Sequence, residues 1–333
     1  MSTPPDSREL SYAQAINEAL REEMRRDSTV MVIGEDVASF GGVYKITDGL
    51  HGEFGSERVL DTPISEAGIT GLGVGAALAG QRPVVEIMFG DFTALVMDQL
   101  VNQAAKIHYM SGGKLRVPLV IRTTMGAGRR MAAQHSQSLH AWFGHIPGLK
   151  VVLPSTPYSA KGLLKTAIRD NSPVIYFEDK MMYRQSGVVP ADDYTIPFGV
   201  ADVVREGKDI TLVATSSMVQ VALNAAVELA KQGISAEVID PQTLTPLDVD
   251  TLVNSVKKTS RCIVIDEGYE RFGATAEIAA VIANKSFYYL DAPVERIGAM
   301  NVPIPFSPTL EDQTIPNEAM VVKKARALLG IAN

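Results

Sequence analysis

The sequence is poor in several features that point to particular classes of protein. It has a single cysteine, Cys262, so no disulfide can form within the chain, and we expect a buried structural thiol in a reducing, cytoplasmic setting. The net charge is −7 and no basic block occurs, which argues against nucleic-acid binding. No uncharged apolar run reaches about 18 residues, so we expect no membrane span. The polar N-terminus lacks the hydrophobic region of a secretory signal.

Common phosphate and zinc motifs are also missing. There is no G-x-x-x-x-G-K-[ST] segment, and no pair of His, Cys or carboxylate residues has zinc spacing. Gly71, Gly73 and Ala76 fit the pattern G-x-G-x-x-A. That pattern can mark a dinucleotide site, but here the glycines do not directly follow a strand. They therefore favour a helix that another element approaches closely, with a dinucleotide oxidoreductase as the weaker alternative.

What the sequence does contain is two series of alternating strands and helices. A chain of 333 residues with 46% hydrophobic content is long enough for two cores. The pattern lapses over a stretch rich in proline and glycine and then resumes. The sequence therefore predicts two three-layer α/β domains with mainly parallel sheets. We expect the boundaries to be 1–185 for the first domain, 186–207 for a linker and 208–333 for the second domain.

Local signals place several elements within these series. Ser11 followed by Gln14 predicts a capping box that opens a helix. A continuous apolar stripe predicts a long helix over Asp91–Met110. Gly233 is placed as a helix C-terminal glycine. Short apolar runs predict strands at 30–34, 58–62, 84–88, 118–122, 150–153, 174–178, 210–214, 235–240, 261–266 and 294–298.

Glu66 is the first candidate for chemistry. It follows the strand-like run that ends at Pro63, and no further charge appears until Arg82. An acid in the first turn of a helix is favoured by the helix dipole, which is a purely structural explanation. Because Ile64 and Ile69 flank Glu66, burial would instead suit a group that exchanges protons. The residues alone leave both explanations open.

Two further candidates lie near the expected carboxyl ends of strands, where parallel α/β sheets bind ligands. His135 sits in a polar loop, 123–148, which is longer than loops without a role usually are. It can act as a general acid or base, or be a solvated loop histidine. Phe92 follows Gly90 at a helix start and can stack on a flat ligand or simply pack in the core.

Taken together, several long segments resemble the β subunit of the E1 component of 2-oxo acid dehydrogenase complexes. The resemblance covers nearly the whole chain, from Ser11 to Pro305. The sequences of segments 125–138 and 302–312 are most similar to the acetoin dehydrogenase branch of this family, with bacterial pyruvate E1 β subunits close behind. The segments are GEDV (34–37), FGGVYKITDGL (40–50), RVLDTPISEAGITGLGVGAALAG (58–80), DQLVNQAAKIHYMSGG (98–113), AAQHSQS (132–138), PGLKVVLPSTPYSAKGLLKTAIRD (147–170) and FSPTLED (306–312).

The resemblance implies thiamin diphosphate chemistry. The first domain would be of the pyrimidine-binding type and the second would resemble the transketolase C-terminal domain. By family position, Glu66 would hydrogen-bond the pyrimidine ring, Ile64 would line it and Phe92 would lie against it. His135 would lie at the mouth of the site as a proton donor or a transition-state stabiliser. A K⁺ ion would be held by Leu119, Ala167, Ile168, Asp170 and Ser172, the last of which replaces an asparagine found in some relatives.

The resemblance also implies partners. The G-D-G…N-N segment that holds diphosphate and Mg²⁺ in thiamin enzymes does not occur in the sequence. An E1 α subunit would supply that side of the site in an α2β2 heterotetramer. The second domain would serve dimerisation and docking to a lipoyl-bearing E2 acyltransferase. The expected activity is that of an oxidoreductase subunit that cleaves acetoin, or decarboxylates pyruvate or a branched-chain oxo acid, and passes the acyl unit to lipoyl. A non-catalytic scaffold that binds the α chain and E2 is the alternative.

Overall fold

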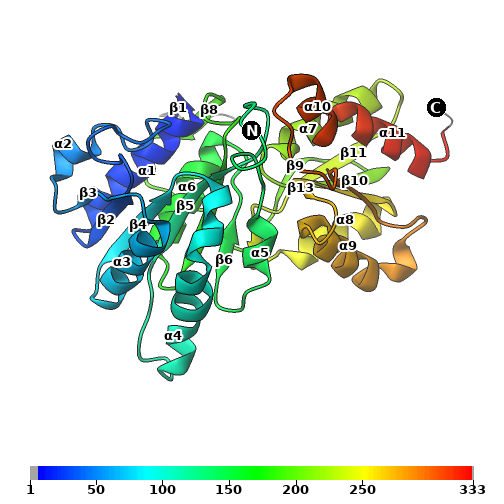
Figure 1. Ribbon diagram of the computed structural model, residues 1–333. Helices are drawn as coiled ribbons and strands as arrows, with labels where there is room; N and C mark the ends of the chain where they lie inside the picture. The colour runs from blue at the N-terminus through cyan, green and yellow to red at the C-terminus, as the bar shows by residue number, and fades with distance from the viewer. Residues whose placement is uncertain (1–6, 332–333) are drawn as a thin grey trace. The chain divides into compact units, whose positions relative to one another are not determined.

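A computed structural model describes residues 7–331 of the chain (Figure 1). Contacts between residues divide it into two compact units. The first unit contains the residues up to Met125 together with Trp142–Phe198. The second contains Gly126–Ala141 together with the residues from Gly199 onward. Each unit is an α/β structure with a mainly parallel sheet, which confirms the predicted fold class.

The sheet of the first unit runs in the order β6-β7-β5-β4-β2-β3, and every neighbouring pair is parallel. Both central strands β5 and β7 are buried at every position, as expected for strands covered on both faces. The bounds are β2 (Val30–Gly34), β3 (Val59–Asp61), β4 (Arg82–Ile87), β5 (Val120–Met125), β6 (Lys150–Val152) and β7 (Val174–Asp179).

Helices and a small antiparallel ribbon complete the first unit. The Ser11 capping box is confirmed: the Ser11 backbone N–H donates to Gln14 Oε1 at 2.8 Å, and the Gln14 N–H donates to Ser11 Oγ at 3.2 Å. The remaining elements are β1 (Ser7–Ser11), which pairs with β8 (Ser186–Pro190), α1 (Tyr12–Arg26), α2 (Leu50–Phe54), α3 (Glu66–Leu78), α4 (Ala105–Met110), α5 (His140–Gly144) and α6 (Pro157–Arg169). The first two residues of α5, His140 and Ala141, belong to the second unit.

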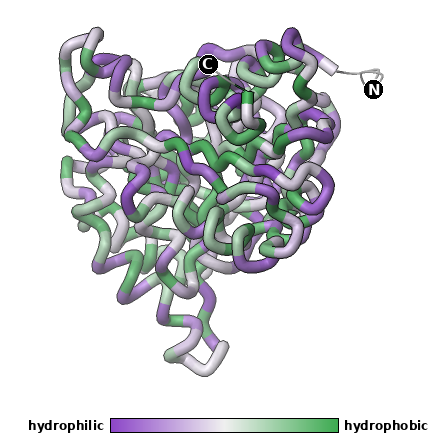
Figure 2. The backbone as a smooth tube through the Cα atoms, turned by 90° about the vertical axis from the view of Figure 1, so that its right-hand side faces the viewer, coloured by the Kyte–Doolittle hydropathy of each residue, from purple (hydrophilic) through white to green (hydrophobic). Residues whose placement is uncertain are grey.

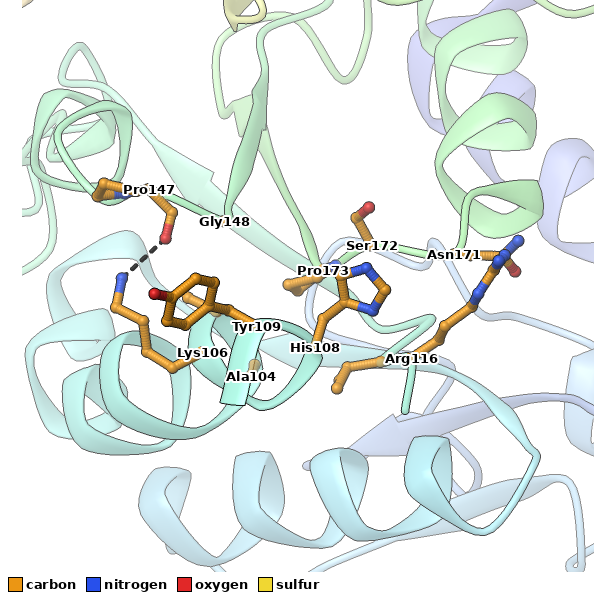
Figure 3. A pocket seen from close by; sticks show the side chains of 12 residues that line it. Ala104, Lys106, His108, Tyr109, Arg116, Pro147, Gly148, Asn171, Ser172 and Pro173 are labelled. Atoms are coloured by element: carbon orange, nitrogen blue, oxygen red, sulfur yellow. Dashed lines mark hydrogen bonds between the residues drawn. The ribbon is translucent and has the colours of Figure 1, made fainter. Parts of the chain in front are cut away.

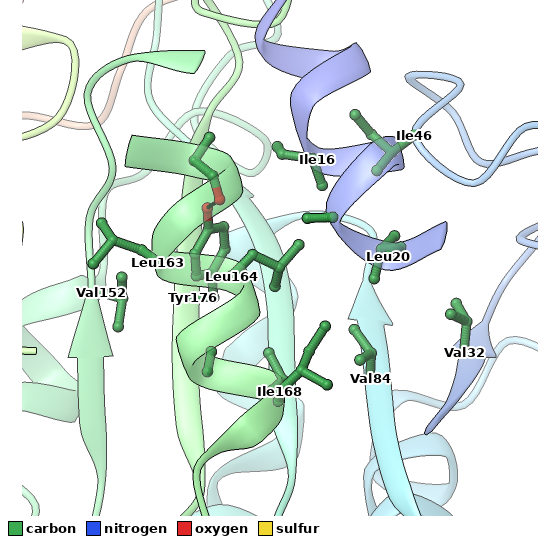
Figure 4. Close-up of a cluster of buried hydrophobic side chains, with 14 of the residues drawn as sticks. Ile16, Leu20, Val32, Ile46, Val84, Val152, Leu163, Leu164, Ile168 and Tyr176 are labelled. Atoms are coloured by element: carbon green, nitrogen blue, oxygen red, sulfur yellow. Dashed lines mark hydrogen bonds between the residues drawn. The ribbon is translucent and has the colours of Figure 1, made fainter. Parts of the chain in front are cut away.

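The main core of the first unit lies where α1 and α6 cover one face of the sheet. Figure 4 shows Ile16 and Leu20 of α1 beside Leu163 and Leu164 of α6, above sheet residues such as Val84, all of them buried. The period of the apolar residues on both helices matches this face, so the sequence pattern and the packing agree. The core anchors the strands whose carboxyl ends carry the candidate site.

In the second unit the sheet order is β14-β13-β10-β11-β9, with β9 antiparallel at one edge. Successive β10 residues face opposite sides: Leu212 joins the cluster under α7 and α11, and Val213 the cluster under α8 and α9. The bounds are β9 (Asp202–Arg205), β10 (Ile210–Ala214), α7 (Met218–Ala230), β11 (Ala236–Asp240), β12 (Thr243–Thr245), α8 (Val249–Thr259), β13 (Cys262–Tyr269), α9 (Ala274–Lys285), the 3₁₀ helix η3 (Phe287–Tyr289), β14 (Glu295–Ala299), α10 (Pro308–Thr314) and α11 (Glu318–Leu328).

Two smaller predictions for the second unit are confirmed. Cys262 is fully buried in β13, and burial raises the pKa of its thiol, as expected for a structural cysteine. Gly233 follows α7 with φ +78°, a left-handed conformation that glycine adopts without strain.

The long helix predicted over Asp91–Met110 is wrong as a single α-helix. The stretch contains a 3₁₀ helix, η1 (Gly90–Val96), a π-helical segment, η2 (Asp98–Ala104), and then α4. Thr93 Oγ1 bonds back to the Gly90 carbonyl at 2.5 Å, which tightens the first turn. A 3₁₀ helix has fewer residues per turn than an α-helix and a π-helix has more, so together they keep nearly the α-helical spacing of apolar residues. The spacing in the sequence therefore could not reveal the two segments.

The segment 186–207, expected to be a linker, contains regular structure. β8 pairs with β1 of the first unit, and β9 pairs with β11 of the second. Proline and glycine occur in this stretch because both strands are short edge strands with turns between them. None of the helices within residues 7–331 is long and apolar enough to span a membrane, and hydrophobic and hydrophilic segments alternate along the backbone (Figure 2).

Candidate active site

The carboxyl ends of parallel strands form one edge of the first sheet. Glu35 directly follows β2, and Glu66 comes five residues after the end of β3 at Asp61. Phe92 lies in η1, which follows β4, and α3 contacts η1. The structure therefore brings three sequence-predicted residues, Ile64, Glu66 and Phe92, to the edge where α/β sheets bind ligands.

Glu66 is the first residue of α3 and is only 8% exposed. Ser65, at the N-cap, makes no side-chain capping bond. Within residues 7–331, no group makes a hydrogen bond or an ion pair with the Glu66 carboxylate. The Glu66 oxygens are not among the buried polar atoms that lack a partner, so the carboxylate reaches the surface and is open to an outside donor.

Glu66 is one of three acidic residues close to Glu35. Burial raises the pKa of Glu35, and the negative charges of Glu66, Asp36 and Glu86 raise it further. Like charges kept close together are a common feature of sites for proton transfer.

Glu86 is neutralised from the sheet side by a residue that sequence reasoning missed. Arg122 in β5 is 2% exposed; its Nη1 donates to Glu86 Oε2 at 2.8 Å, and its Nε and Nη2 donate to Glu178 at 2.7 and 2.9 Å. Burial lowers the pKa of Arg122, but Glu178 and Glu86 outweigh it and raise the pKa above its ordinary value. Tyr183 also donates to Glu178, at 2.8 Å. A charged residue inside an otherwise apolar strand, PLVIR, was the available signal.

Ile64 is 81% exposed, so it does not bury Glu66, contrary to expectation. The turn before α3 directs it outward, and an exposed isoleucine of this kind fits a surface that a flat ring or another chain covers. Phe92 is partly buried and meets Phe89 edge-on, with ring centroids 5.5 Å apart. Gly90 is needed before it, because a Cβ there would lie 2.4 Å from the Thr124 carbonyl oxygen.

His135 belongs to the second unit, although its loop follows β5 of the first. The loop, residues 126–139, has little regular structure, and the His135 backbone N–H donates to the Ala132 carbonyl at 3.4 Å. Ile64, Glu66 and Phe92 thus lie in one unit and His135 in the other.

The five residues expected to hold K⁺ all belong to the first unit. Arg82 Nη1 donates to the carbonyl oxygens of Ile168 and Asp170, both at 2.9 Å, so a guanidinium already occupies part of this cage. Asp170 Oδ1 accepts the N–H of Ser172 at 2.8 Å. Two of the expected carbonyl ligands therefore have a cationic partner, and the K⁺ site stays a prediction for Leu119, Ala167, Ile168, Asp170 and Ser172.

A cavity of about 590 Å³ lies away from this edge (Figure 3). Its lining residues Val117, Gly148 and Pro173 precede β5, β6 and β7, so it opens at the amino ends of the strands. Lys106 Nζ donates to the Pro147 carbonyl at 2.8 Å across its rim. Since ligands of parallel α/β sheets bind at the opposite edge, we do not assign the candidate chemistry to this cavity.

Comparisons with known proteins agree with this geometry. Residues 8–186 match the family "Transketolase, pyrimidine binding domain", and residues 199–321 match "Transketolase, C-terminal domain". The split gene transketolase, inactive beta4 tetramer, is similar in fold, with a TM-score of 0.77 over 97% of this chain and 99% of that chain at 24% identity.

Two curated relatives are much closer in sequence. The chain is 52% identical to the acetoin:2,6-dichlorophenolindophenol oxidoreductase subunit beta of Bacillus subtilis (strain 168), over 97% of this chain and 98% of the relative. It is 48% identical to the pyruvate dehydrogenase E1 component subunit beta of Rhizobium meliloti (strain 1021), over 96% of this chain and 70% of the relative. The chain therefore belongs to the family of β subunits of the E1 components of 2-oxo acid dehydrogenase complexes.

Proposed function

We propose that this chain is the β half of a thiamin diphosphate-dependent E1 and that acetoin is its substrate. The observation that carries the proposal is Glu66: a buried carboxylate at the start of α3, at the ligand-binding edge, without a partner within residues 7–331. When bound, thiamin diphosphate would supply a carbon nucleophile for a carbonyl substrate.

Glu66 would hold a proton against a ring nitrogen of the aminopyrimidine. Burial strengthens that hydrogen bond, because few waters compete for the carboxylate. Ile64 would lie along the ring, which accounts for the exposure of this isoleucine in the chain alone. Phe92 would lie against the pyrimidine, held in place by the close approach of Gly90 to the Thr124 carbonyl.

His135 would deliver or accept a proton at the mouth of the site as the acyl unit passes to the lipoyl group of an E2 acyltransferase. Imidazole is suited to this step since its ordinary pKa lies near neutrality. The second unit would also serve dimerisation and E2 docking.

An E1 α subunit would complete the site in an α2β2 heterotetramer by holding the diphosphate and Mg²⁺. Titration calorimetry with thiamin diphosphate and Mg²⁺ tests this division of labour. We expect strong binding by the α/β complex and none by this chain alone. Tight binding to the chain alone would contradict a shared site, and no binding to either would favour the scaffold alternative.

The choice of acetoin rests on a small margin: 52% identity to the acetoin relative against 48% to the pyruvate relative. A panel of acetoin, pyruvate and a branched-chain oxo acid, each given to the reconstituted α/β complex with a lipoyl domain as acceptor, decides it. We expect the highest kcat/KM with acetoin. A higher kcat/KM with either oxo acid would overturn the subtype while leaving the E1 assignment intact.

A further inference from the structure

The loop that carries His135 is built into the second unit. It leaves β5 at Met125, and residues Gly126–Ala141 then belong to the second unit before the chain returns to the first. The first unit therefore contains only the residues that flank the loop. The conformation of the loop depends on contacts with the second unit.

Three buried carboxylates of the second unit hold the loop. Glu267 Oε1 in β13 accepts the Ala127 backbone N–H at 2.5 Å, and Glu311 Oε1 in α10 accepts the next N–H, of Gly128, at 2.8 Å. At the far end, His140 Nε2 bonds to Asp266 Oδ2 at 2.9 Å. The three carboxylate residues are at most 8% exposed.

A fourth contact joins a side chain of the loop to the Glu311 carboxylate. Arg130 Nη1 donates to Glu311 Oε2 at 2.5 Å and to Asp312 Oδ1 at 2.6 Å. Hydrogen bonds and charge from these two acids raise the pKa of Arg130. Glu311 thus binds the loop with both carboxylate oxygens. One accepts the backbone N–H of Gly128, seven residues before His135, and the other accepts from the side chain of Arg130, five residues before it.

The backbone of the loop is held in conformations that need such support. Arg130 and Ala132 have φ of +59° and +60°, which are unfavourable for residues with a Cβ and persist only when the surroundings impose them. At the other end, a Cβ on Gly268 would lie 2.6 Å from Asp266 Oδ2 and 3.4 Å from the Ser138 carbonyl oxygen. Glycine there allows the loop to lie directly on β13.

We propose that Glu311 and Asp266 are positioning residues that fix the His135 loop from the second unit. Glu311 holds the segment before His135. Asp266 holds the segment after it through the hydrogen bond to His140. This proposal rests on the proposed role of His135, but the anchoring itself can be measured without any activity.

Limited trypsin digestion of the full chain measures how firmly the loop is held, because trypsin cleaves after arginine and the loop contains Arg129 and Arg130. In Glu311→Gln we expect cleavage after these arginines to be about tenfold faster or more, since losing hydrogen bonds to a charge raises the open population by that order. Mass spectrometry of the fragments identifies the cut. Glu237→Gln is the matched control: Glu237 is equally buried in the same unit, but its partners are Lys258 and Gly207 and not the loop.

Arg130→Gln keeps the test valid if Glu311→Gln fails to fold. Arg130 is one-third exposed, so its loss disturbs no core, and cleavage after Arg129 should accelerate in the same way. Cleavage no faster than in Glu237→Gln for either variant would overturn the anchoring.

A double-mutant cycle in the reconstituted α/β complex then tests positioning. We expect Glu311→Gln and Asp266→Asn each to lower acyl transfer to a lipoyl domain, and to have almost no further effect in a His135→Ala background. Fully additive losses would overturn the positioning role. If His135→Ala alone has no effect, the proposed role of His135 fails, while the digestion result still decides whether the loop is anchored.

Discussion

At the scale of single residues, Glu35 and Glu66 make one edge of the first sheet acidic. Burial raises the pKa of Glu35, and Glu66, Asp36 and Glu86 raise it further. A carboxyl whose pKa is higher in the folded chain than in the unfolded chain lowers stability as the pH rises through that interval. Repulsion of this kind is expected to be kept only where the charges have a use.

Glu35→Gln should therefore stabilise the chain at neutral pH. The gain is below about 1 kcal/mol because Glu35 is partly solvated. It should fade as the pH falls towards and below the ordinary carboxyl pKa, because the folded state and then the unfolded state become protonated. Urea unfolding of both proteins at pH 7 and pH 4 measures this. A variant less stable than the parent at pH 7 would show that Glu35 has a stabilising partner instead.

His135→Ala should slow acyl transfer to a lipoyl domain by about tenfold or more, as the loss of a general acid or base does. Thiamin diphosphate binding by the α/β complex should not change, because the proposal gives the pyrimidine contacts to Ile64, Glu66 and Phe92 and gives His135 only the acyl-transfer step. Single-turnover kinetics with the lipoyl domain measures the step. His51→Ala is a suitable control, since His51 is exposed in α2. Equal rates for parent and His135→Ala would remove His135 from the mechanism.

The sequence was informative about Glu66 and less so about its neighbours. An isolated acid before a glycine-rich helix can be read from sequence order alone. Its burial was left open by the sequence, and the structure shows that Glu66 is 8% exposed. Ile64 was expected to cover Glu66, but the turn at Ser65 points it outward, and the direction of a side chain in a turn is set by backbone angles that composition does not encode. Arg122 was missed because its partners Glu86 and Glu178 lie in two other strands.

At the scale of elements, α3 has two different small-residue faces. Gly73 faces the sheet, where a Cβ would lie 2.6 Å from Val85 Cγ2, whereas Gly75 has nothing within 4 Å. Leu72 and Leu78 on the outer side are 49% and 38% exposed. Close packing on the sheet therefore explains Gly73, whereas no atom within residues 7–331 would contact a Cβ at Gly75.

Gly73→Ala should destabilise the chain by about 1–3 kcal/mol through overpacking. Gly75→Ala should stabilise the isolated chain by up to about 1 kcal/mol, since alanine favours the helix. If the outer face of α3 packs on a partner subunit, Gly75→Ala should also weaken the α/β complex. Thermal unfolding and analytical ultracentrifugation of the two variants measure both effects. Unchanged assembly in Gly75→Ala would exclude close packing at this position.

The parallel strands of both units followed from apolar runs because buried parallel strands must be apolar on both faces. The short strands β1, β8, β9 and β12 were not predicted. The turns within Gly90–Met110 did not follow, since their hydrogen-bond spacing leaves no separate mark on the pattern. That the His135 loop belongs to the second unit could not be predicted from the sequence either. It depends on Glu267 and Glu311, which lie more than a hundred residues away in sequence.

At the scale of the whole molecule, the proposal gives this chain one half of an active site, the other half belonging to an α subunit. The first unit offers a pyrimidine-type edge with Glu66, and the second unit holds the His135 loop. Neither offers a segment of the type that binds diphosphate and Mg²⁺. Activity should therefore depend on assembly with an α subunit.

Turnover of the reconstituted α/β complex carrying Glu66→Gln tests the central claim most directly. We predict a loss of at least about a hundredfold in kcat with intact assembly, because glutamine keeps the shape of Glu66 and cannot exchange the proton. Glu57→Gln, the same change at an exposed residue just before β3, should retain full activity. Near-parental turnover in Glu66→Gln would contradict the account.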